Sequence, residues 1–545
     1  NIGTYNLTLG ASSNVYSVLT GTTASFSGTK MIRSAGNLSD GGLTKTYNST
    51  TSFLFPFGTA SDYTPATLQF TVAPTTWGSV TMRPVAQIEP FATSTNALTY
   101  YWKVTSDGFT GVQAGSVSHS YKYVDSDIVG TEANYIPAAY RPFSWVPIND
   151  ISKVVDASNT VLFNNINVID GDYTAGELSA FQAVKVYYSR LSGDWNNVNS
   201  WSSVAVGGAI DGTIPGANNP VVIGDATNNH TITVPIGYNN IVVGGLQISK
   251  GSVLDLQTTT GHNFGAIPDT KIQGNGTLKI STAAAIATFP SGDFGNFLSR
   301  GGGTVVYYST ATLGASTFTL PTTYTSGSST INIVGYNNLI TSAQTGKSIT
   351  LPNNNLEIFD DYTVDGTGIS QLNNTATSRL VTIDSNLVIQ SGTLRYTNGN
   401  NTAQNVVVYG DAIVNTGATF DVNTTGNATN SLTLYGNLTN NGIFDMYTGT
   451  NQICNVTFTG NTDKEINGTG ATTDFNTIVV NKGSSRNTLL EVKSSALTLN
   501  TNLATALTLT NGTFRLTSPI ILNLTNSGSF NIPISGSLSA NGGTI

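Results

Sequence analysis

The sequence predicts an all-β protein, a parallel β-helix (β-solenoid) with a β-sandwich domain inserted into it or preceding it. The first observation is a phrase of glycine followed by apolar residues that returns at a nearly constant spacing. Gly251 and Gly276 are 25 residues apart, and Gly392, Gly417 and Gly442 follow each other at 25 and 25. A period of about 20–50 residues indicates a repeat architecture.

Composition is the second observation. Hydrophobic residues make up 39% of the 545 residues and charged residues only 10%, well below the share of about 25% in an average globular protein. Asn, Thr, Ser and Gly carry the polarity, and the strand-forming residues Val, Ile, Thr, Tyr and Phe are plentiful. The third observation is strict period-two alternation over a region rich in aromatic residues, which is typical of short half-buried strands.

Taken in chain order, the elements divide into four segments. Residues 1–51 resemble the repeat phrases and are predicted as β-helix-like coils. Residues 52–190 alternate, as in "LTYYWKV", and are predicted as an Ig-like β-sandwich. Residues 191–240 contain "DWNNVNSW" and are predicted as a linker or capping module. Residues 241–545 are predicted as the parallel β-helix, with coils of about 20–26 residues, irregular at about 303–390.

Each repeat holds at least two short strands, and each strand is expected to pair with its counterpart one coil away. In register, Leu394, Phe420 and Phe444 form an inward column. Arg395, Asp421 and Asp445 form an outward column. Leu254 stacks on Leu278 likewise, which sets Asp255 beside Lys279. Asn and Thr at the coil corners are expected to form side-chain ladders.

Charge and cysteine content narrow the function classes. The net charge is −8, so no basic stripe for nucleic acid is predicted. No apolar run approaches the ~18 residues of a membrane span. Cys454 is the single cysteine and is predicted to be a buried thiol. Because the chain begins with Asn and stops within a repeat phrase, we expect it to be a piece of a longer protein.

Few residues are candidates for catalysis or metal binding. The carboxylates Asp421 and Asp445 resemble the pairs that polysaccharide-cleaving β-helices use for acid–base hydrolysis or for calcium. The alternative is ordinary surface polarity, with Arg395 and Asp421 as a cross-strand ion pair. Two acidic loops are candidate calcium sites, which makes calcium the one candidate cofactor; their residues are Asp125, Asp127, Asp170 and Asp172. The three histidines show no zinc spacing.

Three segments carry a resemblance to a known class of proteins. "FLFPFGTASDYTPATL" (53–68) with "LTYYWKV" (98–104) resembles a module of very large secreted surface proteins of Bacteroidetes. "SGDWNNVNSWSS" (192–203) resembles their two-tryptophan module, although the usual acidic residue before its last strand is absent. "TFTGNTDKEINGTGATTDFNTIVVNK" (457–482) resembles their coil phrase.

The resemblance implies export by the type IX secretion system and an extracellular place on the cell surface, attached to the outer membrane. It also implies a role as an adhesin, including in gliding motility. The implied partners are the secretion and anchoring machinery and a surface polysaccharide or abiotic surface. The aromatic side chains expected to stack on sugars are Tyr100, Trp102, Tyr121 and Tyr123.

We therefore predict a non-enzymatic adhesin or adhesin-stalk segment. Two alternatives stay open. One is a β-helix polysaccharide lyase or hydrolase, whose acids would include Asp360, Asp361 and Asp365. The other is a ligand-free spacer or a surface-layer protein. The β-helix fold is compatible with all three functions and therefore does not decide between them.

Overall fold

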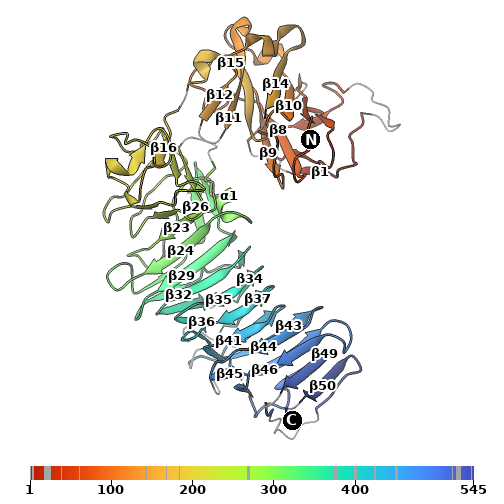
Figure 1. Ribbon diagram of the computed structural model, residues 1–545, viewed down its shortest axis with the longest axis vertical. Coiled ribbons are helices and arrows are strands. Elements are labelled where there is room, and N and C mark those ends of the chain that lie inside the picture. The colour runs from red at the N-terminus through yellow and green to blue at the C-terminus, as the bar shows by residue number, and fades with distance from the viewer. Residues whose placement is uncertain are drawn as a thin grey trace. The chain divides into compact units, whose positions relative to one another are not determined.

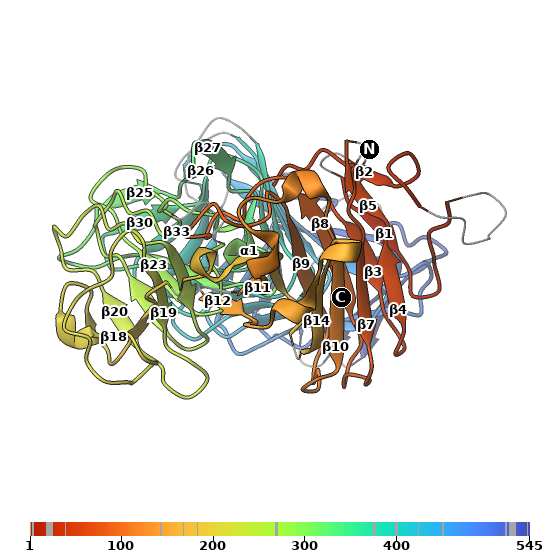
Figure 2. The same ribbon diagram turned by 90° about the horizontal axis from the view of Figure 1, so that it is seen from above.

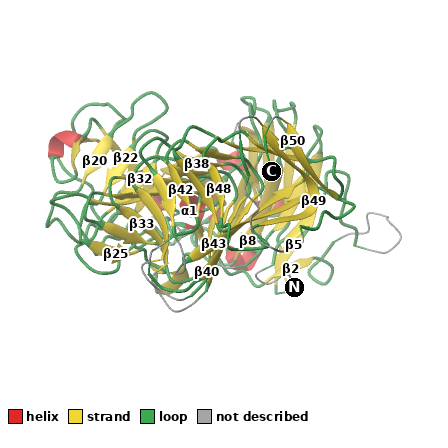
Figure 3. Cartoon of the chain, turned by 90° about the horizontal axis from the view of Figure 1, so that it is seen from below, coloured by secondary structure: helices red, strands yellow, loops and turns green. Residues whose placement is uncertain are grey.

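The computed structural model describes the chain apart from a set of short stretches. These are residues 1, 3–4, 18–25, 39, 61, 142–143, 167, 183, 267–270, 374–377, 398–401, 423–424, 449–451, 518–519, 523–529, 542 and 545. About 47% of the chain is strand and 4% helix, which confirms the all-β class. Yellow strands joined by green loops dominate Figure 3, with helix confined to short pieces. The chain divides into two compact units, residues 1–186 and a C-terminal unit that begins at Tyr187.

The N-terminal unit is built from three sheets. From one edge to the other, the first contains β1 (Leu7–Leu9), β3 (Leu43–Thr46), β8 (Ser79–Val85), β9 (Tyr101–Asp107), β15 (Gly171–Glu177), β11 (Tyr135–Arg141) and β12 (Ser144–Pro147). The second contains β13 (Val154–Val155), β14 (Thr160–Ile166), β10 (Val117–Lys122), β7 (Ala66–Phe70) and β4 (Ser52–Phe55). The third contains β2 (Ile32–Ser34), β5 (Phe57–Thr59) and β6 (Asp62–Tyr63).

The first two sheets share one hydrophobic core. Trp102 of β9 and Tyr121 of β10 face each other with ring centroids 4.9 Å apart, and Tyr173 of β15 lies 5.2 Å from Tyr121. Figure 2 shows β14, β10, β7 and β4 side by side, the four longer strands of the second sheet. The Ig-like β-sandwich assignment stays a prediction.

The N-terminal segment differs from its predicted coils. In residues 1–51 the described strands join this unit: β1 pairs with β3, β3 pairs antiparallel with β8, and β2 pairs with β5. Turns between the strands include short 3-10 helices, which are η1 (Asp125–Asp127), η2 (Glu132–Asn134), η3 (Ile151–Lys153), η4 (Asp156–Ser158) and η5 (Leu178–Ala180).

The C-terminal unit is the predicted parallel β-solenoid, in which three ladders of parallel strands run from coil to coil (Figure 1). The first ladder contains β17 (Gly193–Asp194), β20 (Thr231–Thr233), β22 (Val253–Asp255), β23 (Thr277–Ile280), β24 (Thr304–Ser309), β29 (Asn338–Ala343), β32 (Tyr362–Gly366), β35 (Leu387–Ile389), β38 (Ala412–Val414), β41 (Leu438–Asn440), β44 (Lys464–Asn467), β47 (Leu489–Val492), β49 (Leu507–Thr517) and β50 (Gly536–Asn541).

The second ladder contains β28 (Gly335–Tyr336), β31 (Leu356–Ile358), β34 (Arg379–Ile383), β37 (Gln404–Val408), β40 (Thr429–Leu434), β43 (Ile453–Gly460) and β46 (Thr477–Lys482), and ends on β49. The third contains β25 (Thr317–Thr319), β30 (Ser348–Thr350), β33 (Ile369–Asn373), β36 (Thr393–Thr397), β39 (Thr419–Asp421), β42 (Ile443–Asp445), β45 (Thr472–Phe475) and β48 (Leu497–Leu499).

The start of this unit includes the predicted capping module. A small sheet here contains β18 (Trp201–Ser202), β16 (Tyr187–Ser189), β19 (Pro220–Ile223) and β21 (Gly245–Ile248), of which β16 and β21 lie outside the predicted residues 191–240. The 3-10 helix η6 (Val198–Ser200) precedes β18. Trp195 and Trp201 are buried in the solenoid core, 5.0 Å apart and edge to face. The two-tryptophan segment therefore belongs to the solenoid.

The predicted register is confirmed. Leu394, Phe420 and Phe444 stack in line and have no exposed surface. Leu254 stacks on Leu278, and Asp255 lies beside Lys279 at 3.7 Å.

The predicted irregularity at 303–390 is narrower in the structure. The short helix α1 (Gly295–Leu298) precedes β24. Between β24 and β29 the chain inserts a hairpin of β26 (Thr323–Ser326) and β27 (Ser329–Asn332). From β29 onward the pairing is regular, because β29 pairs with β32 and β32 pairs with β35, all in parallel.

A polar ladder runs along the start of the first-ladder strands. Its members are Asn338, Asp361, Asn386, Asp411, Asn437 and Glu465. From Asn338 to Asn437, each side-chain oxygen accepts the backbone N–H of the next member, at 2.8–3.0 Å. The amide of Asn386 also donates to Asp361 at 3.1 Å. The ladder thus satisfies backbone donors at a coil corner, where the sheet hydrogen bonds end.

Candidate functional site

The structure corrects the four aromatic residues predicted to bind sugars. Tyr100, Trp102, Tyr121 and Tyr123 are at most 1% exposed. Their polar atoms are used internally: the indole N–H of Trp102 donates to the Thr64 carbonyl at 3.1 Å. Because alternation in both sheets turns these side chains into the shared core, none offers a free ring face to a ligand.

The predicted calcium ligands lie in two separate places. Asp125 and Asp127 lie on η1, where Asp127 accepts the Val124 N–H and Asp125 accepts the side-chain amide of Asn159. Burial raises the pKa of Asp127 above its usual value, which disfavours the charged form that calcium needs.

The second pair, Asp170 and Asp172, also has protein partners. Asp172 forms a nearly buried ion pair with Lys103 at 2.8 Å. Burial raises the pKa of Asp170, and hydrogen bonds from Ser106 partly oppose this. Over the described residues, no three His, Cys, Asp or Glu side chains converge as a metal site.

The outward column of the third ladder is a cluster of charged groups. Register places Arg395, Asp421, Asp445 and Asp474 on four successive strands, β36, β39, β42 and β45. Arg395 binds Asp421 with two parallel hydrogen bonds of 2.8 and 2.6 Å, from Nε and Nη2. At the other end Thr498 donates to Asp474 at 2.7 Å. We call Arg395, Asp421, Asp445 and Asp474 the acid column.

Three stacked carboxylates in one column interact electrostatically. Burial raises the pKa of Asp421, and the Arg395 guanidinium partly offsets this. Burial also raises the pKa of Asp445, and the neighbouring charges of Asp474 and Asp421 raise it further. The pKa of Asp474 is raised by burial and lowered by its hydrogen bond from Thr498. A carboxyl group with a raised pKa beside an ionised one is the arrangement that general acid–base hydrolysis uses.

The acids of "FDDYTVD" do not join this column. Asp361 is part of the polar ladder, and its oxygen accepts the backbone N–H of Asn386. Asp365 accepts the hydroxyl of Ser391 at 2.9 Å. Asp360 is exposed. The side chains of Asp361 and Asp365 therefore serve neighbouring coils rather than one shared site.

The histidines have structural roles. Burial lowers the pKa of His119 to about 3 and that of His262 to about 4, so both are neutral at pH 7. His230 and Ser189 form a contact of 2.8 Å that resembles a nucleophile–base pair. However, Ser189 is fully buried and its oxygen also accepts the Gly224 N–H. A buried hydroxyl held in this way is not positioned to attack a substrate.

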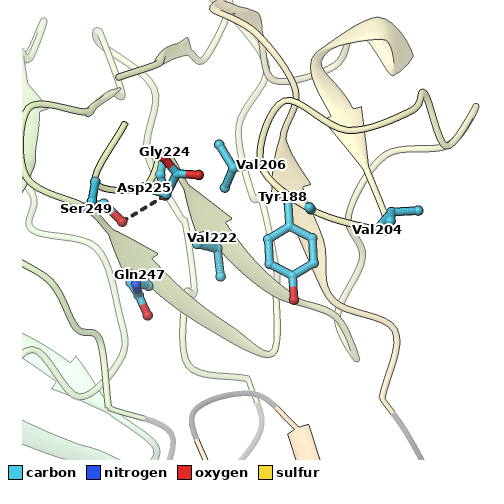
Figure 4. Close-up of a pocket in the computed structure, with 10 residues that line it drawn as sticks. Tyr188, Val204, Val206, Val222, Gly224, Asp225, Gln247 and Ser249 are labelled. Carbon is cyan, nitrogen blue, oxygen red and sulfur yellow. Dashed lines mark hydrogen bonds between the residues drawn. The ribbon is translucent and has the colours of Figure 1, made fainter. Parts of the chain in front are cut away.

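An open cavity of about 440 Å³ lies nearby (Figure 4). Tyr188, Val222 and Gln247 line it from β16, β19 and β21. Asp225 is its one charged lining residue. Backbone hydrogen bonds from Thr227 and Asn228 lower the pKa of Asp225 to about 2, so it remains ionised and cannot exchange protons near neutral pH.

The structure also contains an exposed aromatic pair that was not predicted from the sequence. Tyr409 is 49% exposed and its ring lies 4.6 Å from that of Tyr435. Each follows a strand of the second ladder and precedes a glycine, so the recurrence of "YG" 26 residues later is the signal that marks the pair.

Comparison with protein-family models, curated proteins and solved structures finds no match. In the part of the chain that the structure describes, no helix is both long enough and apolar enough to cross a bilayer. The side-chain geometry and the resemblance of the repeat phrases are therefore the two grounds on which a function can rest.

Proposed function

We propose that this chain is a segment of a cell-surface adhesin or adhesin stalk that mediates attachment to surfaces or glycans. The observation that carries the proposal is the run of parallel strand pairs from β17 to β50, over one continuous apolar core. Each coil is bonded to the next by many backbone hydrogen bonds in parallel, and a pull along the stack loads them together. Such a stack suits a stalk under shear.

The resemblance of the repeat phrases supports a setting for this role. It favours an extracellular protein on the cell surface, exported by the type IX secretion system, attached to the outer membrane and active in gliding motility. Within this proposal the partners are the export and anchoring machinery and a polysaccharide or abiotic surface.

The test is retention under flow. Beads carrying the purified chain are passed over glass, polystyrene and a panel of immobilised polysaccharides, and beads carrying Phe444→Asp serve as a control for the folded solenoid. We expect retention by the parent chain and loss of retention by the variant. Failure of the parent chain on every surface would contradict adhesion and favour a ligand-free spacer or surface-layer role.

A second candidate function is polysaccharide cleavage, which the acid column favours. Asp445 has a raised pKa and is flanked by Asp421 and Asp474. Assaying the same polysaccharides for released sugars separates the two functions. Product release that Asp421→Asn and Asp445→Asn abolish, with folding intact, would make the protein a hydrolase or lyase.

A further inference from the structure

One corner of the solenoid presents a strip of large side chains. Register places Phe359, Asp384, Tyr409 and Tyr435 directly after β31, β34, β37 and β40, on four successive coils. The coil rise of about 4.8 Å gives the strip a length of about 14 Å. We call these four residues the aromatic corner.

Exposure distinguishes the tyrosines of this strip from the core aromatic residues of the third ladder. Phe420 and Phe444 have no exposed surface, whereas Tyr409 is 49% exposed and Tyr435 half-buried. The two tyrosine rings are tilted by 31° at 4.6 Å. At this distance each ring covers one face of the other, and their outer faces and edges are left, already ordered, for a ligand with a flat apolar face.

The end of the strip beyond Tyr435 is lined by small residues. The next coil contributes Thr459, which follows Phe458 in register, and then Gly460. A Cβ atom at Gly460 would lie 3.3 Å from Cδ1 of Tyr435. A side chain here would press on the ring, so glycine lets the backbone pass close to the edge of the Tyr435 ring.

The opposite end of the strip carries fixed hydrogen-bonding groups. Arg300 donates to Asp384 at 2.5 Å and to the Phe359 carbonyl at 2.8 Å, with its guanidinium 5.6 Å from the Phe359 ring. The Arg300 side chain is nevertheless 65% exposed. Guanidinium and carboxylate groups that are already oriented and still reachable are suited to bind hydroxyl groups.

We propose that the aromatic corner binds a neutral polysaccharide laid along the coils. The C–H faces of sugar rings pack against the outer faces and edges of Tyr409 and Tyr435, and the pair of Arg300 and Asp384 binds ring hydroxyls. The net charge of −8 disfavours polyanionic chains such as alginate or pectate. The inference rests on the proposed adhesin function and names the ligand class and site for it.

The test is affinity electrophoresis of the whole chain in native gels that contain hydroxyethylcellulose, xylan or alginate. Tyr409→Ala and Tyr435→Ala remove the stacking surface. Ile443→Ala is the matched control, because Ile443 is 43% exposed and lies on the third ladder. We expect retardation of the parent chain by a neutral polysaccharide, about tenfold weaker binding for each tyrosine variant, and no change for Ile443→Ala.

The outcomes separate the site from the function. Equal retardation of the parent and tyrosine variants overturns the inference and leaves adhesion standing, with binding located elsewhere. No retardation of the parent by either neutral polysaccharide also overturns the inference, and bead retention on glass and polystyrene then decides adhesion by itself. Thermal unfolding of each variant excludes loss of the fold as the cause of weaker binding.

Discussion

The two units of this chain solve the same problem, burying one face of many short strands, in different ways. The N-terminal unit uses mainly antiparallel pairs and closes its core with large aromatic rings, among them Trp102, Tyr121 and Tyr173. The solenoid uses parallel pairs and a core of stacked Leu, Ile, Val and Phe. In the N-terminal unit each core residue has its own packing environment, whereas in the solenoid the same core position recurs from coil to coil.

This difference determines where an aromatic residue is free to act. At the start of β9 in the N-terminal unit, Tyr101 and Trp102 point to opposite faces of the sheet and are both buried. In the solenoid the positions after each second-ladder strand lie at a corner, and Tyr409 is exposed there. An aromatic residue therefore indicates a binding surface in the solenoid more readily than in the N-terminal unit. Substitutions placed in one unit at a time test this contrast.

The largest effect is expected from Phe444→Asp in the solenoid. Phe444 has no exposed surface and lies between Phe420 and Phe475, so a buried, unpaired carboxylate should destabilise the neighbouring coils by more than about 4 kcal/mol. Limited proteolysis with mass spectrometry should show new cuts in the solenoid and none in residues 52–186. Asp445→Asn is the control; equal losses in both variants would contradict the inward and outward assignment.

Trp102→Ala should destabilise the N-terminal unit and leave the solenoid intact, the reverse of Phe444→Asp. Removal of a fully buried indole costs about 3–5 kcal/mol, and this cost should fall on the N-terminal unit alone. Hydrogen exchange measured separately over each unit tests this. Ile151→Ala, at a position 61% exposed in the same unit, is the control. Faster exchange in the solenoid would show that the two units unfold together.

Asn386→Asp should have a smaller effect, local to the polar ladder. The variant loses the amide that donates to Asp361 and places a third acid between Asp361 and Asp411, which should cost about 1–2 kcal/mol. Chemical unfolding gives the value, and Asn353→Asp adds the same charge at an exposed position. No difference between the two variants would show that the ladder contributes nothing.

The smallest effect is a dependence on pH. The pKa values of Asp421, Asp445 and Asp474 are raised in the folded chain, chiefly by burial. Ionised carboxylates therefore oppose folding at neutral pH, and this opposition disappears as pH falls through the folded pKa to the unfolded one.

Lowering the pH from 7 towards 4 should therefore stabilise the solenoid at this column. Asp445→Asn should remove part of that dependence and raise stability at pH 7 by less than about 1 kcal/mol, since solvent screens the column. Melting temperatures of the parent and variant across this range test the sign. If the Asp445→Asn variant is no more stable than the parent chain at pH 7, the predicted sign of the effect is wrong.

The solenoid could be predicted from the sequence because its signal is repeated. The spacing of Gly392, Gly417 and Gly442 sets the coil length, and the register of Arg395 on Asp421 follows from it. The fixed spacing of about 4.8 Å between parallel strands leaves little freedom once the period is known.

The sequence pattern is insufficient where the structure depends on packing that does not repeat from coil to coil. Alternation in "LTYYWKV" shows which residues share a face, but not that a second layer covers each face. The sequence alone therefore leaves Tyr100 and Trp102 as candidate surface residues, although both are core. The strands of residues 1–51 pair with partners far along the chain, such as β3 with β8, and no local pattern encodes such a pairing.

The polar ladder has a consequence for how such a chain lengthens over generations. Asparagine and aspartate alternate along Asn338, Asp361, Asn386, Asp411 and Asn437. A gene duplication that copied a single coil would set two aspartates, or two asparagines, in contact. Copying two coils together keeps the alternation, so growth by pairs of coils would preserve the ladder in this part of the solenoid.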